Sequence, residues 1–171
     1  MPGYEVETTT VRIGGLDYRI RALRDRLQYA DPDGRAERAG ISSATWPLFG
    51  LVWPSGVALA EAAATLPIEG RRILEVGCGL GLASLVLARR GADVTASDLH
   101  PLAEEFLREN AALNGLAPIP YRDAPRVGAF GKRMAAQGYA RAEPWPRFAG
   151  VGAPARRGRI LSFVRAAPHS V

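Results

Sequence analysis

The sequence predicts an α/β fold built on a parallel sheet, and three observations in its central part support this. A short apolar run, Ile73–Val76, breaks into glycines at positions 77, 79 and 81, as a buried strand does when it turns sharply into a helix. An apolar stretch over about 80–90 follows as that helix. A second run of small and β-branched residues over 92–97 ends at Asp98, as a second strand would. Together they indicate the repeating unit of a Rossmann-like sheet.

The flanking segments continue this pattern in order along the chain. Residues 8–20 alternate around Gly14-Gly15, which predicts an N-terminal β-hairpin. A charged, turn-rich segment over 24–40 is either an ordinary connection or a cover for a site. Three further elements are then expected: a helix over 56–65 with Ser55 as its N-cap, a helix over 101–113, and a third strand over 119–122.

The glycine spacing separates several kinds of nucleotide-binding turn. A dinucleotide-binding turn needs its third glycine or alanine where Leu82 stands, and a phosphate-binding P-loop needs a Lys-Ser or Lys-Thr pair that does not follow. The turn therefore fits a ligand without phosphates. The structural alternative is a tight strand-to-helix turn that binds no ligand.

Two residues outside the glycine turn fit a nucleoside site. Asp98 ends the second strand 21 positions after Gly77, where a carboxylate can accept both hydroxyls of a ribose, or can cap the next helix. Trp53 precedes the first long helix and belongs either to a ligand pocket or to the core.

The order Glu75-x-Gly77-x-Gly79-x-Gly81 resembles motif I of the class I S-adenosylmethionine (SAM) methyltransferases. Preceded by a helix and by the element 53–56 (Trp-Pro-Ser-Gly), it resembles the seven-strand protein-lysine methyltransferases, whose bacterial members include nicotinamide N-methylase-like proteins. The resemblance covers about residues 10–123 and implies SAM as cofactor. It also implies a set of cofactor-binding residues: Trp53, Glu75, Gly77, Cys78, Gly79, Gly81, Asp98 and Leu99.

The C-terminal third departs from this family. Residues 128–139 are similar to the family's last helix and 159–165 to its final strand, but nothing between Asp123 and Gly128 can supply the fourth strand, its helix and the fifth strand. We therefore expect an incomplete sheet of reduced stability, or one in which the strand over 159–165 takes the vacant place. In this family the groups that orient the methyl acceptor come largely from the end of the fourth strand. Because that strand is missing here, the resemblance implies no catalytic residue in this chain. The two histidines, His100 and His169, are expected at the surface.

Composition is compatible with one domain over 1–171, made of a lead-in (1–45), a cofactor-binding half (46–123) and a C-terminal part (124–171). The one cysteine, Cys78, excludes a disulfide framework, and we expect no metal site. The start of the chain lacks the pattern of a signal peptide, and no apolar run is long enough to cross a membrane, so a soluble cytoplasmic protein is expected.

Charge is distributed unevenly along the chain. Residues 1–123 carry 13 Arg against 16 Asp and Glu, whereas residues 124–171 carry nine Arg and Lys against one Glu. An acidic segment missing from between the two parts would leave this imbalance; a nucleic-acid-binding arm is the rival interpretation. Arg outnumbers Lys 21 to one in the whole chain, which favours a general compositional bias, and we do not expect nucleic acid as the partner.

Three functions follow. The first is a SAM-dependent methyltransferase that N-methylates a protein lysine or another amine, with activity impaired by the missing segment. The second is a catalytically inactive SAM-binding remnant or binding module, and the third is a basic, nucleic-acid-associated domain.

Overall fold

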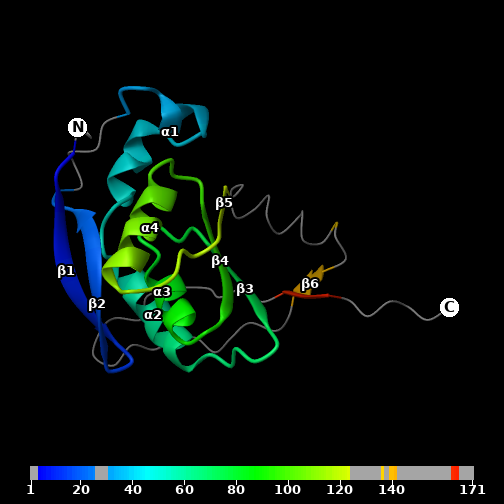
Figure 1. Cartoon of the computed structure of the whole chain (residues 1–171). Helices are drawn as coiled ribbons and strands as arrows, with labels where there is room; N and C mark the ends of the chain where they lie inside the picture. The colour runs from blue at the N-terminus through cyan, green and yellow to red at the C-terminus, as the bar shows by residue number, and fades with distance from the viewer. Residues whose placement is uncertain (1–3, 26–30, 124–135, 137–138, 142–162, 166–171) are drawn as a thin grey trace. The chain divides into compact units, whose positions relative to one another are not determined.

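The computed structural model describes residues 4–25, 31–123, 136, 139–141 and 163–165 (Figure 1). The chain divides into two compact units, residues 1–124 and residues 125–171, and each is described by itself. The single domain expected over 1–171 stays a prediction.

The N-terminal hairpin is confirmed. Strands β1 (Val6–Ile13) and β2 (Leu16–Leu23) pair antiparallel, with Ile13 opposite Leu16. Gly14 and Gly15 make the turn with φ of 56° and 81°, the left-handed pair of values that a two-residue hairpin turn requires. The inner side of the hairpin buries large side chains and so forms part of the core.

Three helical segments follow the hairpin: α1 (Arg35–Arg38), the 3₁₀ helix η1 (Ser43–Leu48) and α2 (Pro54–Thr65). Helix α2 begins two residues earlier than expected. Trp53 is its N-cap residue and Pro54 its first helical residue, so the expected Ser55 cap is wrong. The physical reason is that proline at the first helical position is already set in helical φ and needs no hydrogen-bond acceptor for its nitrogen.

A three-stranded parallel sheet of order β3-β4-β5 confirms the α/β prediction for the central part. Its strands β3 (Arg72–Val76), β4 (Asp93–Asp98) and β5 (Tyr121–Asp123) are connected by α3 (Leu82–Arg89) and α4 (Ala103–Leu113). Within this first unit helices α2, α3 and α4 lie between the hairpin and the sheet (Figure 1). Strand β2 packs on α4, β1 packs on α2, and α3 and α4 pack on β4.

The core lies between these layers. Residues 82–87 of α3 are all buried, which fits a helix enclosed on every side. The largest fully buried side chains come from the hairpin and from the two connecting helices: Ile13, Tyr18, Ile20, Leu23, Leu85, Phe106 and Leu107. Among the described residues, no helix is long and apolar enough to cross a membrane.

Strand β3 differs from the buried strand that its apolar sequence predicts. None of its residues is buried, and Leu74 is 40% exposed. Within the described residues β3 pairs with β4 alone, so it is an edge strand, and an edge strand is solvated where a neighbour is missing.

The second unit contains a two-stranded antiparallel sheet of β6 (Tyr139–Arg141) and β7 (Phe163–Arg165). The final strand expected over 159–165 therefore contributes its last three residues to β7, whose recorded partner is β6 and not β3. The helix expected over 128–139 lies almost wholly outside the described residues, and its last residue, Tyr139, belongs to β6 instead.

Candidate functional site

The glycine turn lies at the carboxyl edge of the parallel sheet, where β3 ends and α3 begins. The N–H groups of Gly77 and Cys78 both donate to the Ser97 carbonyl of β4, at 2.8 and 3.0 Å. Gly81 then caps α3 with φ of 80°, so that the helix starts at Leu82, two residues later than the sequence suggested. The turn is thus anchored to the neighbouring strand at one end and to a helix at the other.

The glycines of the turn do two different things. A Cβ built on Gly77 or Gly79 would meet nothing within 4 Å, and both have positive φ, 74° and 54°. A Cβ on Gly81 would instead lie 2.2 Å from Cδ1 of Leu107. Gly77 and Gly79 therefore leave open space in which a ligand can approach the backbone, whereas Gly81 allows α4 to pack closely.

Asp98 ends β4 beside this open space. Its Oδ2 accepts a hydrogen bond from the Gly79 N–H at 2.7 Å, and its Oδ1 accepts one from the His100 N–H at 2.8 Å. Asp98 therefore does not cap the following helix, because α4 begins only at Ala103 with Leu102 as its N-cap residue. Each carboxylate oxygen retains further acceptor capacity, so Asp98 can still accept ribose hydroxyls.

Glu75 stabilises the turn from the strand side. Its Oε2 accepts the Ser84 N–H at 2.9 Å and the Ser84 hydroxyl, so it satisfies an otherwise unpaired donor in the first turn of α3. The pKa of this carboxyl is raised to about 7: burial raises it most, the two bonds from Ser84 lower it, and the charge of Asp98 makes a smaller contribution that raises it. Ser84 was not identified from the sequence, although a serine near the start of the expected helix could have indicated it.

Cys78 and Leu99 flank the same space. Cys78 is buried, and this burial, followed by the charges of Glu75 and Asp98, raises the pKa of its thiol well above the usual range. Cys78 is therefore a small packing residue and not a nucleophile. Leu99 is half-buried directly after Asp98.

Trp53 belongs to a separate element. Its Nε1–H donates to the Leu48 carbonyl at 2.8 Å, and the residue is 37% exposed. Hydrogen bonds thus join the glycine turn to Asp98 and Glu75 to the first turn of α3. The bond of Trp53 instead ties it to η1.

His100 is buried, which contradicts the surface position expected from the sequence. Its ring stacks on Phe49 with the centroids 3.7 Å apart and the planes 4° from parallel, and its Nδ1 accepts the Leu102 N–H at 3.2 Å. Burial lowers the pKa of His100 to about 4, so the ring is neutral at physiological pH. An apolar partner distant in sequence, Phe49, is the reason that the residue lies inside. His169 lies outside the described residues.

Tyr121 is a second residue that the sequence did not indicate. Its hydroxyl donates to the Asp98 carbonyl at 3.0 Å, and burial raises the pKa of this phenol. Strand β5 thereby supports the end of β4 that carries the Asp98 carboxylate.

The chain was compared with known proteins. Residues 74–126 match the family model described as a methyltransferase domain. The electron transfer flavoprotein beta subunit lysine methyltransferase of Danio rerio is 38% identical over 77 residues, 43% of this chain and 30% of that protein. The Mus musculus protein of the same name is 29% identical over 126 residues, 70% of this chain and 48% of that protein.

Two further matches come from other methyltransferases. The ubiquinone biosynthesis O-methyltransferase of Methylocella silvestris is 52% identical over 56 residues, 33% of this chain and 22% of that protein. The solved SAM-dependent methyltransferase of Agrobacterium tumefaciens is 21% identical with a TM-score of 0.47, over 81% of this chain and 41% of that one.

The chain spans less than half the length of the curated relatives that it matches. All of these sequence matches lie with methyltransferases, and the family match begins in β3 and includes the glycine turn and Asp98. Residues 74–126 thus match a methyltransferase domain, and the chain is similar to SAM-dependent methyltransferases, protein-lysine methyltransferases among them.

Proposed function

We propose that this chain binds SAM at the carboxyl edge of β3 and β4 and serves N-methylation of a protein lysine. One observation carries the proposal: the Asp98 carboxylate is hydrogen-bonded to the Gly79 N–H, directly beside the open space over Gly77 and Gly79. A carboxylate at the end of β4, next to a backbone turn that no side chain obstructs, suits a nucleoside with a free ribose.

The residues present fit the cofactor, and each has a definite part. Gly77 and Gly79 allow the ligand to approach the backbone, Asp98 accepts hydroxyl donors, and Glu75 keeps the turn in shape through Ser84. Cys78 and Leu99 flank the turn, and Trp53 is proposed as a cover from the start of α2. When bound, SAM supplies a methyl group on a sulfonium centre, and the protein's contribution is to hold an unprotonated acceptor nitrogen in line with it.

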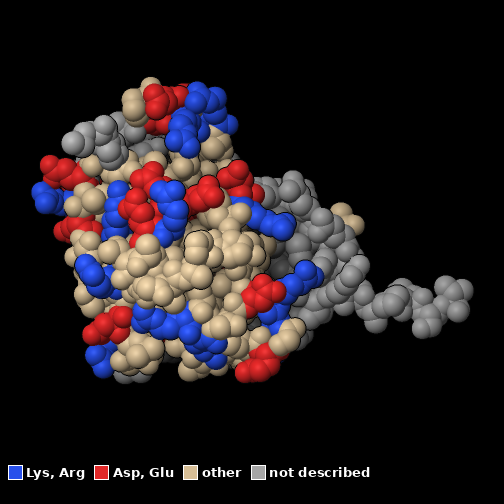
Figure 2. All heavy atoms as spheres, viewed as in Figure 1, with Lys and Arg blue, Asp and Glu red and all other residues tan. Residues whose placement is uncertain are grey.

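A protein lysine is the proposed acceptor because two of the relatives described above act on a protein lysine by name. The same names suggest the beta subunit of electron transfer flavoprotein as the first acceptor to try, and a small-molecule amine is the alternative. The nucleic-acid interpretation finds no support on the face drawn in Figure 2. There, acidic and basic side chains of the described residues are interspersed and form no basic track.

Calorimetric titration with S-adenosylhomocysteine tests the cofactor site. Wild type should bind, and Asp98→Ala should weaken binding at least about tenfold, because a charge-assisted hydrogen bond contributes about 1.5–3 kcal/mol. Asp93→Ala is the matched control: Asp93 is exposed at the opposite end of β4, and its variant should bind like wild type. No heat with wild type, or equal binding by a folded Asp98→Ala protein, would refute the proposed site.

Transfer is measured separately, with SAM labelled on the methyl group. Label on the flavoprotein beta subunit supports the protein-lysine acceptor, and label on free lysine alone replaces it with a small-molecule amine. Binding of S-adenosylhomocysteine without transfer to either acceptor favours the SAM-binding module without catalysis.

A further inference from the structure

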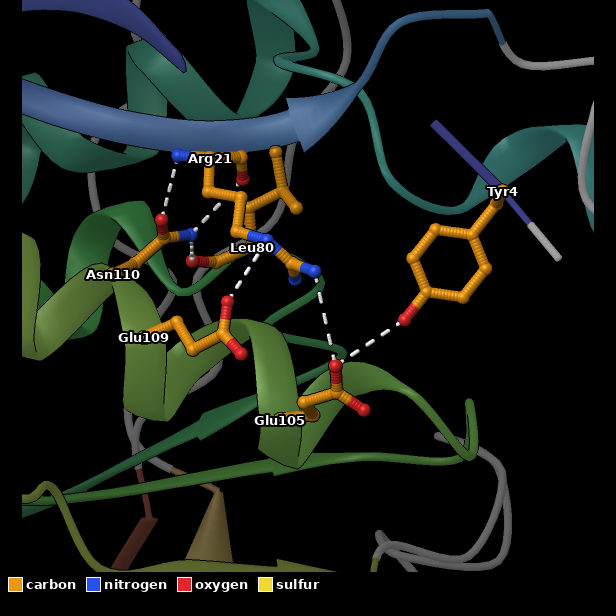
Figure 3. Close-up of polar contacts among 6 residues, drawn as sticks. All are labelled: Tyr4, Arg21, Leu80, Glu105, Glu109 and Asn110. Carbon is orange, nitrogen blue, oxygen red and sulfur yellow. Dashed lines mark hydrogen bonds and ion pairs between the residues drawn. The ribbon is translucent and has the colours of Figure 1, made fainter. Parts of the chain in front are cut away.

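The side-chain amide of Asn110 joins the N-terminal hairpin to the glycine turn. Asn110 lies on α4 and is fully buried. Its Oδ1 accepts the Arg21 N–H of β2 at 2.7 Å, and its Nδ2 donates to the Arg21 carbonyl at 3.3 Å and to the Leu80 carbonyl at 3.0 Å (Figure 3). Both donors of the amide are therefore used, one on the hairpin and one on the turn.

Asn114, one helical turn later, makes the same pair of bonds to the hairpin but makes no bond to the glycine turn. Its Oδ1 accepts the Arg19 N–H at 3.0 Å, and its Nδ2 donates to the Arg19 carbonyl at 2.7 Å. Its Nδ2 also donates to the Asn110 carbonyl at 2.7 Å, on its own helix and not on the turn.

The two asparagines match the spacing of the strand. Four residues along a helix rise about 6 Å, and two residues along a strand rise about 6.7 Å. Two amides at positions 110 and 114 can therefore bond alternate residues of β2, and they pair the strand edge that β1 leaves open.

The side chain of Arg21 strengthens the same attachment. Its Nε lies 2.8 Å from Glu109 Oε2, and an Nη lies 3.8 Å from Glu105 (Figure 3). Its guanidinium also lies over the Phe106 ring. The Tyr4 hydroxyl donates to Glu105 at 3.2 Å. The hairpin is thus held on α4 by its backbone and by its side chains.

Leu80 occupies a decisive position in the turn. It stands between Gly79, whose N–H bonds Asp98, and Gly81, whose N–H bonds the Cys78 carbonyl at 2.8 Å. The Gly81 N–H and the Leu80 carbonyl belong to the same peptide unit, so this peptide is held on one side by the Cys78 carbonyl and on the other by the Asn110 amide. Loss of the Asn110 donor removes one of these two restraints between two flexible glycines and leaves a buried carbonyl unsatisfied.

We propose that Asn110 is a positioning residue for the cofactor turn, and that through this amide the hairpin holds the turn in its binding shape. The role in binding rests on the function proposed above. Asn110 is not assigned any contact with the cofactor; it acts through Leu80.

The two asparagines supply a matched pair of variants. Asn110→Ala and Asn114→Ala each remove an amide from the hairpin, but only the first removes the bond to Leu80. Titration with S-adenosylhomocysteine should show a loss of affinity on the order of tenfold for Asn110→Ala, with Asn114→Ala within about twofold of wild type. Equal affinity in the two folded variants would overturn the proposal.

Hydrogen exchange of the ligand-free proteins is the second measurement. Asn110→Ala should speed exchange in a peptide spanning residues 77–82, whereas Asn114→Ala should speed exchange in β2 and leave that peptide at the wild-type rate.

Should wild type fail to bind S-adenosylhomocysteine, the proposed function fails, while this comparison still decides whether Asn110 holds the turn. Should Asn110→Ala not fold, the pair Asn110→Leu and Asn114→Leu, which fills the same space without a donor, replaces it with the same expected contrast. Equal exchange over 77–82 in the two variants would overturn the proposal.

Discussion

Replacing Glu75 by glutamine should flatten the pH dependence of stability. Glutamine keeps the shape of Glu75 and an oxygen that can accept the two bonds from Ser84, but it removes the titrating charge. In the folded protein burial raises the pKa of Glu75 from 4.5 to about 7. Glu75→Gln therefore isolates the free energy of holding a desolvated carboxylate at the end of β3.

The magnitude follows from linkage between protonation and folding. The folded state keeps the Glu75 proton up to a pH near 7, whereas the unfolded chain releases it near 4.5. The stabilisation by the proton is complete below pH 4.5 and is lost as the pH rises through 7, so the free energy of unfolding falls with rising pH. Since one pKa unit corresponds to about 1.4 kcal/mol, the difference between 4.5 and about 7 gives a total fall of about 3.5 kcal/mol.

Chemical unfolding in guanidinium, followed by circular dichroism from pH 4.5 to 8, measures this fall. The difference in free energy of unfolding between wild type and Glu75→Gln should decrease across this range by most of the total fall calculated above. Glu7→Gln makes the same chemical change at an exposed position of β1, and its curve should parallel that of wild type. Parallel curves for wild type and Glu75→Gln would refute the reasoning.

Two further variants test the turn. Gly81→Ala should destabilise the protein by about 1–3 kcal/mol more than Gly91→Ala, because the two glycines share nearly the same φ, 80° and 78°, but only the new methyl at 81 overlaps the buried Leu107. Equal losses in thermal or chemical unfolding would show that backbone strain alone matters. Ser84→Ala removes a hydrogen bond that lowers the pKa of Glu75; the pH range in which stability falls should therefore move upward in the same unfolding series, and an unmoved range would contradict this account.

Much of the fold could be predicted because its signals are local. Alternation around Gly14-Gly15 predicted the hairpin, and the order of strand, glycine turn and strand predicted the parallel sheet that β3, β4 and β5 form. The boundaries moved by about two residues where local chemistry competed. Pro54 started α2 early, and the bonds within the glycine turn delayed α3 to Leu82.

Only part of the candidate cofactor site could be predicted from the spacing of residues in the motif, because the rest depends on contacts that such spacing does not reveal. The motif indicated Gly77, Gly79 and Asp98, and the structure joins the last two by a hydrogen bond. It did not indicate that Gly81 serves the packing of α4, or that the carboxylate of Glu75 is used on Ser84.

The sequence by itself determined the order of the elements, the shape of the turn and the class of cofactor that the turn resembles, because these depend on residues close together in the chain. Only the tertiary structure decided that His100 is buried against Phe49, and that β3 is solvated at an edge of the described sheet. It alone brought Asn110 to both Arg21 and Leu80. These contacts join residues from 30 to almost 90 positions apart, and packing between layers, not any local preference of the chain, brings such residues together.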